Sequence, residues 1–195
     1  MEEAKKVLAL FETVEKWNAF IELSNMRTEM VNELKHRLLV ELKIIADKNL
    51  NSSWTFWFDN NHISISPKDS KLIAVRIEWS WWNDPKSPWC RRGACIWIDA
   101  QNTNSKKIFD LIKSNKQNLP IQDFEDNIQN HDWFPFIKQI PSSVFNVDDN
   151  VTSVEGCLFM AKDNAVMLAK NLWDNVFMPF TTNEIADLMS DFVTQ

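Results

Sequence analysis

Glycine is almost missing from this chain, since Gly93 and Gly156 are the only two among 195 residues. Average usage of about 7% would give roughly 14. A P-loop and a dinucleotide-binding turn both need glycines at fixed spacing, so that backbone N–H groups can approach phosphates closely. Neither glycine has the required neighbours. The scarcity therefore excludes both kinds of nucleotide site.

Long apolar runs are also missing, and the sequence predicts no secretory leader. No stretch reaches the roughly 18 uncharged apolar residues of a membrane span. The first residues are acidic and lack the basic and apolar regions of a signal peptide. The three cysteines, Cys90, Cys95 and Cys157, form an odd set without regular spacing, which is typical of free thiols in a reducing compartment. We therefore expect a cytoplasmic protein that does not contact a membrane.

Positive charge is in short supply. The chain has 21 Lys and Arg against 27 Asp and Glu, a net charge of −6. This balance argues against broad binding to nucleic acid or to anionic membranes. Apolar residues make up 45% of the chain, which is ordinary for a globular protein. The length predicts a single domain.

The first fifty residues predict two helices. Apolar residues recur every three or four positions over 2–23 and again over 25–47, with Ser24 available to cap the second helix. Together they predict a helical hairpin.

The pattern then changes to strands. Residues 54–58, 62–66, 72–82 and 94–99 read as strands joined by short turns, which predicts an antiparallel meander. Alternation over 72–82 puts Arg76 and Glu78 on one face. The other face carries Ile73, Val75, Ile77, Trp79 and Trp81.

The remaining sequence alternates helical and irregular segments. The predicted elements are a helix over 104–113, a short helix over 121–130, an edge strand over 133–140 that contains Pro135, an irregular stretch over 141–153, and helices over 163–177 and 182–193, the last with a Thr181–Glu184 capping box. The predicted fold class is α+β, with an N-terminal helical hairpin, a meander of about four to five strands and C-terminal helices. Residues 1–195 form one domain: 1–50 the hairpin, 51–140 the sheet with inserted helices, and 141–195 the C-terminal helical part.

Tryptophan is abundant, and seven of the ten lie between Trp54 and Trp97. The loop after the third strand is aromatic, interrupted by proline and locally basic. Trp and Arg are the side chains most enriched at binding hot spots, because they bury a large area and stack well. We therefore predict a contact surface for another protein, made by Trp82, Trp89, Arg91 and Arg92. Single-stranded nucleic acid is a further alternative, since aromatic rings beside basic groups stack bases, but the net charge counts against it.

Catalytic and metal-binding patterns are weak. The spacing of cysteines and histidines does not match a zinc site, and we predict no catalytic residue, no metal ligand and no cofactor. The alternative is a metal-dependent hydrolase that uses Glu78, Asp84 and Asp99, which lie on or near the predicted strands.

The order of these features resembles the accessory region that follows the catalytic core in bacterial PD-(D/E)XK-nuclease-like proteins. The matching segments span about residues 10–115 and are Glu15-Lys16-Trp17, a second charged helix, Trp54 to Phe58, Ile63 to Ile65, Ile77 to Trp79 and Gly93 to Ile96. The resemblance implies a non-catalytic α+β module and carries over no catalytic residue. We predict a cytoplasmic accessory protein of bacterial or phage origin, with a regulatory, immunity or anti-defence role.

Overall fold

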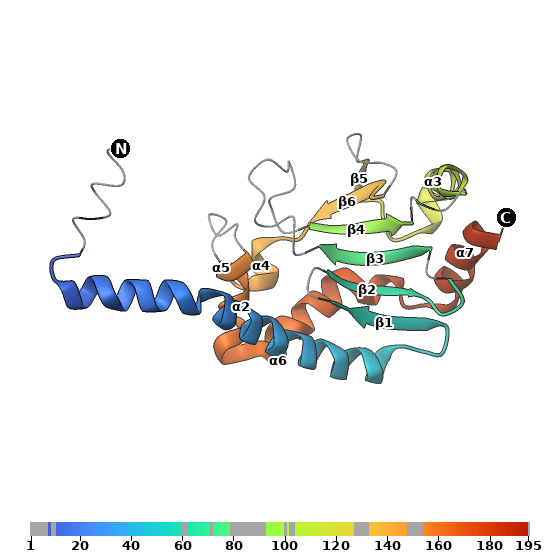
Figure 1. The fold of residues 1–195 in the computed structure, drawn as a ribbon. Coiled ribbons are helices and arrows are strands. Elements are labelled where there is room, and N and C mark those ends of the chain that lie inside the picture. The colour runs from blue at the N-terminus through green and yellow to red at the C-terminus, as the bar shows by residue number, and fades with distance from the viewer. Residues whose placement is uncertain are drawn as a thin grey trace.

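The computed structural model describes residues 8, 11–59, 62–70, 72–78, 93–99, 101, 104–126, 133–147 and 154–194. A long helix precedes an antiparallel sheet, and further helices follow it (Figure 1). This arrangement confirms the predicted α+β class, although the sheet has six strands instead of four to five. Within the described ranges, no helix has the length and apolar character needed to cross a membrane.

The helical hairpin is wrong, because one unbroken helix, α2, spans Val14–Asn49. This range contains neither glycine nor proline, so no residue forces the backbone out of the helix near Ser24. The helix begins at Thr13, whose side chain accepts a hydrogen bond from the Lys16 N–H at 3.3 Å. Thirty-six residues make a rod about 54 Å long.

The sheet has the spatial order β1-β2-β3-β4-β6-β5, and all neighbours are antiparallel. Its strands are β1 (Trp54–Phe58), β2 (His62–Pro67), β3 (Ile73–Glu78), β4 (Gly93–Ile98), β5 (Glu125–Asp126) and β6 (Phe136–Gln139). The first four form the predicted meander. However, β6 lies between β4 and β5 and is not the predicted edge strand. Pro135 directly precedes β6, so it removes no hydrogen bond from the ladder.

Short helices fill the rest of the described chain. They are α3 (Ser105–Ser114), α4 (Ser142–Phe145), α5 (Val154–Leu158), α6 (Ala161–Leu172) and α7 (Asn183–Thr194), with tighter or wider turns at Lys116–Asn118, Trp173–Phe177 and Met178–Phe180. The helices predicted over 104–113 and 182–193 are confirmed within one residue as α3 and α7. The helix predicted over 163–177 is confirmed as α6 together with the wider turn at Trp173–Phe177 that continues it. The short helix over 121–130 is wrong in its described part, which contains β5, and α4 lies in the stretch predicted to be irregular.

The last helix starts one residue later than its capping box suggested. Thr182, rather than Thr181, accepts a hydrogen bond from the Ile185 N–H at 3.3 Å. The neighbouring threonine hydroxyl instead donates to the carbonyl of Met178 at 2.9 Å.

The hydrophobic core lies between one face of the sheet and the helices. Side chains from this face are fully buried with those of α2, α6 and α7; they include Ile63, Ile65, Ile73, Val75, Ile77, Leu38, Leu42, Leu172 and Met189. The predicted alternation in β3 is thus confirmed, because its odd-numbered residues face the helices. Its even-numbered residues are also buried but project on the other side of the sheet, which we call the open face because the core helices pack against the opposite side.

Candidate functional site

The predicted contact residues fall in a segment outside the described residues. They are Trp82, Trp89, Arg91 and Arg92. The strands on either side of that segment are described, since β3 ends at Glu78 and β4 begins at Gly93. The four residues therefore stay a prediction, and the described structure next to them is the open face of these strands.

Two of the three acidic residues considered for a metal site lie far apart. Glu78 is the last residue of β3. Asp99 follows β4, and its backbone N–H donates to the carbonyl of Leu72 at 2.9 Å, beside the start of β3. Six residues of extended strand separate these positions by about 20 Å, so one ion cannot bind both carboxylates. Asp84 lies outside the described residues, among which no three potential ligands gather closely enough to hold a metal ion.

One row of side chains crosses the open face from β1 to β4. Trp57 is paired with Ser64, Ser64 with Arg76, and Arg76 with Cys95 in the strand register. Residues directly opposite each other in neighbouring strands share a face. The register therefore brings together four side chains that come from four different strands.

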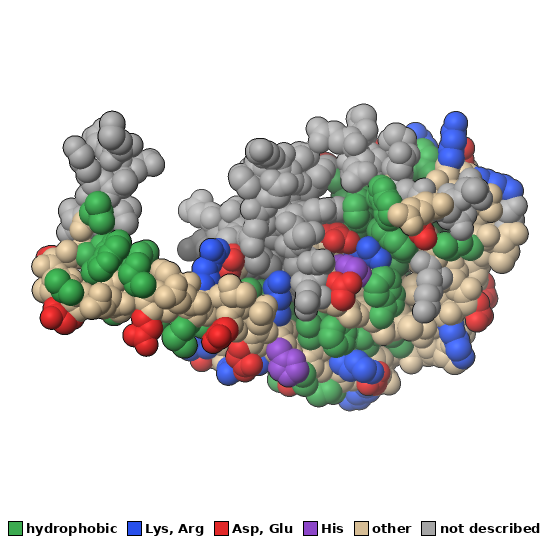
Figure 2. Space-filling model, viewed as in Figure 1, with side chains coloured by type: hydrophobic (Ala, Val, Ile, Leu, Met, Phe, Trp, Pro, Cys, Tyr) green, Lys and Arg blue, Asp and Glu red, His purple; other side chains and the backbone are tan. Residues whose placement is uncertain are grey.

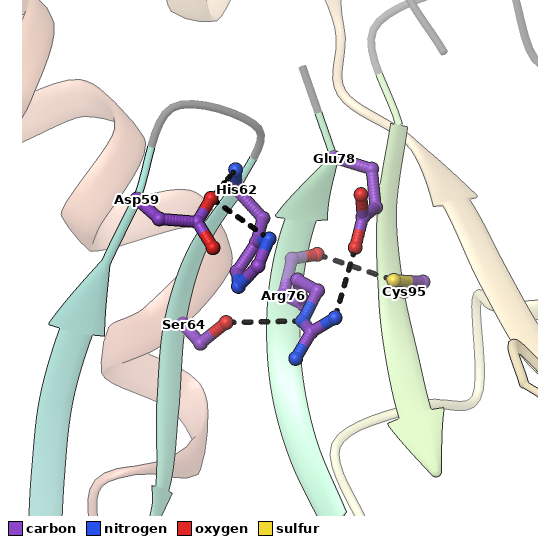
Figure 3. A network of polar contacts seen from close by, with 6 residues as sticks. All are labelled: Asp59, His62, Ser64, Arg76, Glu78 and Cys95. Atoms are coloured by element: carbon purple, nitrogen blue, oxygen red, sulfur yellow. Dashed lines mark hydrogen bonds and ion pairs between the residues drawn. The ribbon is translucent and has the colours of Figure 1, made fainter. Parts of the chain in front are cut away.

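Arg76 holds the centre of this row (Figure 3). Its Nε donates to Ser64 Oγ at 3.1 Å, and its Nη1 donates to Glu78 Oε1 at 3.2 Å. The side chains of the ion pair are each only 7% exposed. The guanidinium carbon also lies 4.9 Å from the ring centre of Trp57 and 4.0 Å from that of Trp97. The cation is thus in contact with two indoles, each of which attracts it through its ring electrons.

Burial lowers the pKa of the Arg76 guanidinium, while the nearby Glu78 carboxylate opposes this shift. Arginine nevertheless stays charged in proteins, because its ordinary pKa is so high. Removing two charges from water is costly, and apolar side chains of similar volume are often at least as stable in such a position. The pair is therefore better explained by what it binds or orients than by its contribution to stability.

His62 lies at the start of β2, beside the network. Its Nδ1 is 3.1 Å from Asp59 Oδ1, and its ring packs edge-on against Trp57 with the ring centres 4.9 Å apart. His62 Nε2 and Trp57 Nε1 are buried and have no hydrogen-bond partner among the described residues. Burial and the charge of Arg76 lower the pKa of the imidazole more than Asp59 raises it.

This lowered pKa predicts a loss of stability in mild acid. The unfolded chain takes up a proton on His62 near pH 6.5, whereas the folded protein keeps the imidazole neutral to lower pH. Since the unfolded state then binds more protons, the free energy of unfolding falls as the pH drops below about 6.5, until the lower folded pKa has been passed. We expect His62→Asn to show a smaller decrease in melting temperature than the wild type between about pH 7 and pH 5. Thermal melts followed by circular dichroism measure this, and equal decreases would contradict it.

Cys95 is not a nucleophile in this setting. The side chain is fully buried, and burial together with the nearby Glu78 raises the pKa of its thiol well above the usual range. Its Sγ donates to the carbonyl of Arg76 at 3.5 Å. Because only the thiolate attacks substrates or binds metals, the role of this cysteine is packing. Cys157 is buried as well, and Cys90 lies outside the described residues.

A cavity of about 380 Å³ opens on the same face. Thr55, Trp57, Ser66, Lys68 and Trp97 line it. Indole rings form much of its wall, and two hydroxyl groups and one ammonium group supply polarity. Pockets of roughly 300–1,000 Å³ with mainly apolar walls and a few polar groups are typical ligand sites. Figure 2 shows hydrophobic, charged and histidine side chains gathered over this part of the sheet.

Sequence reasoning singled out the loop and missed this face. Trp57 and Trp97 lie in predicted strands, and alternation already placed Arg76 with Glu78 on one side of β3. That shared side was the available signal. The missing information was the pairing of strands, which determines that both tryptophans flank the same arginine.

Comparisons of this chain with protein-family models, with curated proteins and with solved structures found no match.

Proposed function

We propose that this chain is a non-catalytic binding protein and that its partner contacts the open face at the cavity beside Trp57 and Trp97. The observation that carries the proposal is the Arg76 guanidinium, which contacts both indoles that line the cavity. Trp and Arg are the side chains that contribute most often to interface hot spots.

The rigidity of the site supports recognition. Arg76 is fixed by hydrogen bonds to Ser64 and Glu78, and its position in turn limits the two indoles. Side chains that are already ordered lose little entropy when a partner binds. The same bonds engage Arg76, Ser64 and Glu78 with one another, which suits a binding surface better than a set of reactive groups.

Charge favours a protein over nucleic acid as the partner. The net charge of the chain is −6, and the carboxylates of Asp59 and Glu78 lie in the network itself. The exposed Lys68 lines the cavity. Its ammonium group could pair with a carboxylate of a partner protein whose neighbouring apolar side chain enters the cavity. We include Trp82, Trp89, Arg91 and Arg92 in the same contact surface, since their segment joins β3 to β4.

The proposed biological role is that of a cytoplasmic accessory protein in bacteria or phages, acting in regulation, immunity or anti-defence. The acidic charge and small size support this role, as does the resemblance to the region after PD-(D/E)XK nuclease cores. Identifying the bound partner tests this role.

Thr55→Arg should abolish partner binding, because a long charged side chain would fill a cavity to which the exposed Thr55 contributes. The measurement is affinity capture from a source-cell lysate, read by mass spectrometry, with and without nuclease treatment. The matched control is Thr194→Arg, which places the same side chain at an exposed site at the end of α7. We expect a protein captured by the wild type and by the control but not by Thr55→Arg, in both lysates.

Two outcomes would contradict the proposal. Capture that disappears after nuclease treatment would indicate a nucleic-acid ligand. Equal capture by Thr55→Arg and the control, with both variants folded by circular dichroism, would move the contact surface away from the cavity.

A further inference from the structure

The N-terminal half of α2 projects from the body of the protein (Figure 1). We call residues 14–30 the α2 arm. Every residue of this arm is exposed, and its length is about 25 Å. By contrast, Leu38, Leu42 and Ala46 in the same helix are fully buried. One continuous helix thus has a buried half and an exposed half.

The exposed half nevertheless carries many large apolar side chains. Its large hydrophobic side chains are between 38% and 69% exposed; they are Val14, Trp17, Phe20, Ile21, Leu23, Met26 and Met30. Figure 2 shows hydrophobic side chains gathered at the free end of the projecting helix, with acidic side chains along the rest of it. Surface helices normally carry polar residues on their exposed faces, whereas eight of the seventeen residues of the arm are apolar.

The side of the helix that carries Trp17 and Phe20 is the side that enters the core. Val31, Leu34 and Leu38 follow at the same three- and four-residue spacing, after the polar residues Ser24 and Arg27. Val31 and Leu34 pack against the core, and Leu38 lies inside it. The same side of the helix is therefore buried by this chain at one end and offered to a partner at the other.

The apolar area on one side of the arm is large enough for a small interface. Val14, Ile21 and Met26 lie about 100–120° around the helix from Phe20, so Trp17, Phe20, Leu23 and Met30 share a side with Phe159, which is 56% exposed. Large side chains have roughly 200 Å² each, and these five leave about half of it accessible. This gives on the order of 500 Å² per copy, and about 1,000 Å² for a pair of arms is the lower bound of a specific interface.

A second cavity lies where the arm leaves the body. Its volume is about 390 Å³, and its walls include Phe20, Leu23, Met30 and Phe159. Arg27 of the arm donates to Glu155 of α5 at 2.7 Å at this place. The base of the arm thus offers an apolar recess of a size that an aromatic side chain can enter.

The free end of the arm carries aromatic side chains of that kind. Phe11 and Trp17 cluster there with Phe20, which also lines the recess, and the ring centres are 4.8–5.7 Å apart. If Trp17 of one copy lies opposite Met30 of another, each aromatic end meets the recess of its neighbour. Such an arrangement is antiparallel and symmetric, with a two-fold axis near Ser24, and it closes as a dimer.

Charge along the helix favours the antiparallel direction. Residues 12–22 contain three acidic side chains and one basic, whereas residues 27–37 contain three basic and two acidic. An antiparallel pair keeps the two acidic ends apart and puts each beside the base of the other arm, where Arg27 is paired with Glu155. A parallel pair would place like charge beside like charge.

We propose that two copies of this chain associate through antiparallel packing of their α2 arms, each aromatic end entering the recess at the base of the other arm. This interface is separate from the open face of the sheet. The partner that covers the arm is therefore a second copy, and the binding function of the open face is left free in the dimer.

The test is the mass of the full chain in solution, measured by light scattering and analytical ultracentrifugation over a range of concentrations. The wild type should have twice the chain mass of 22.9 kDa. Phe20→Glu places a charge in the interface twice, once per copy, and should raise the dimer dissociation constant by at least about 100-fold. The matched control, Val166→Glu, changes a side chain of α6 that is 59% exposed, and should remain a dimer.

A cross-link tests the direction of the arms independently of any loss of folding. Ser24→Cys lies near the proposed axis and should form a disulfide-linked dimer on mild oxidation. Glu22→Cys lies two residues away, about 200° around the helix, and should cross-link no more than the wild type. A monomeric wild type, an intact dimer in Phe20→Glu, dissociation by Val166→Glu, or equal cross-linking at positions 22 and 24 would each overturn the proposal.

Discussion

Arg76→Met should lower the free energy of unfolding by about 3–5 kcal/mol, the usual cost of breaking a buried ion pair. Both side chains of the Arg76–Glu78 pair are only 7% exposed, so water cannot replace the guanidinium beside the carboxylate. The same variant loses the hydrogen bond to Ser64 and both indole contacts. For a chain of this length the melting temperature should fall by roughly 10 °C, which calorimetry measures.

Arg37→Met is the matched control. Arg37 also pairs with a glutamate, Glu33, at 2.8 Å, but these side chains are 47% and 56% exposed. Exposed pairs contribute at most about 1 kcal/mol. If Arg76→Met destabilised the protein no more than this control, the buried network would not be a structural unit. The double variant Arg76→Met with Glu78→Met should recover part of the loss, because it no longer buries one charge without the other.

Leu42→Ala should lower the free energy of unfolding by about 2–5 kcal/mol, through lost burial and the space left behind. Leu42 is fully buried where α2 packs in the core. Ile44→Ala, two residues further along the same helix, changes a side chain that is 55% exposed. Alanine is the best helix former, so the control should stay within about 0.5 kcal/mol of the wild type.

This pair of variants separates docking of the helix from helix formation. Denaturant unfolding followed by circular dichroism gives both free energies. A small effect of Leu42→Ala, equal to that of Ile44→Ala, would mean that the C-terminal half of α2 is not part of the core. It would also contradict the distinction between a C-terminal half of α2 that is buried in the core and an arm that is exposed.

Local patterns in the sequence predicted much of the fold. Alternation over 72–82 assigned the described residues of β3 to their correct faces, and the three-to-four spacing located α3. These patterns succeed because the period of side chains along a strand or helix is fixed by the backbone. The ends of helices were predicted less accurately, as the shift of the α7 cap from Thr181 to Thr182 illustrates.

The helical hairpin failed for a physical reason. Ser24 and Asn25 read as a break because such side chains compete for backbone hydrogen bonds. In the structure the helix continues through both residues, since the segment contains neither the glycine nor the proline that would break it. The three- and four-residue spacing of apolar residues is nearly the same for two short helices as for one long helix, so the sequence pattern does not distinguish them.

The sequence by itself determined the α+β class, the core-facing residues of the central strand and the absence of glycine-dependent nucleotide sites. Only the tertiary structure decided that Trp57, Arg76 and Trp97, from β1, β3 and β4, meet on one face. It alone showed that Glu78 and Asp99 lie at opposite ends of the sheet and that half of α2 projects. Local preferences act over a few residues, whereas strand pairing and helix docking join positions many residues apart, and their order depends on how the whole chain buries its apolar surface.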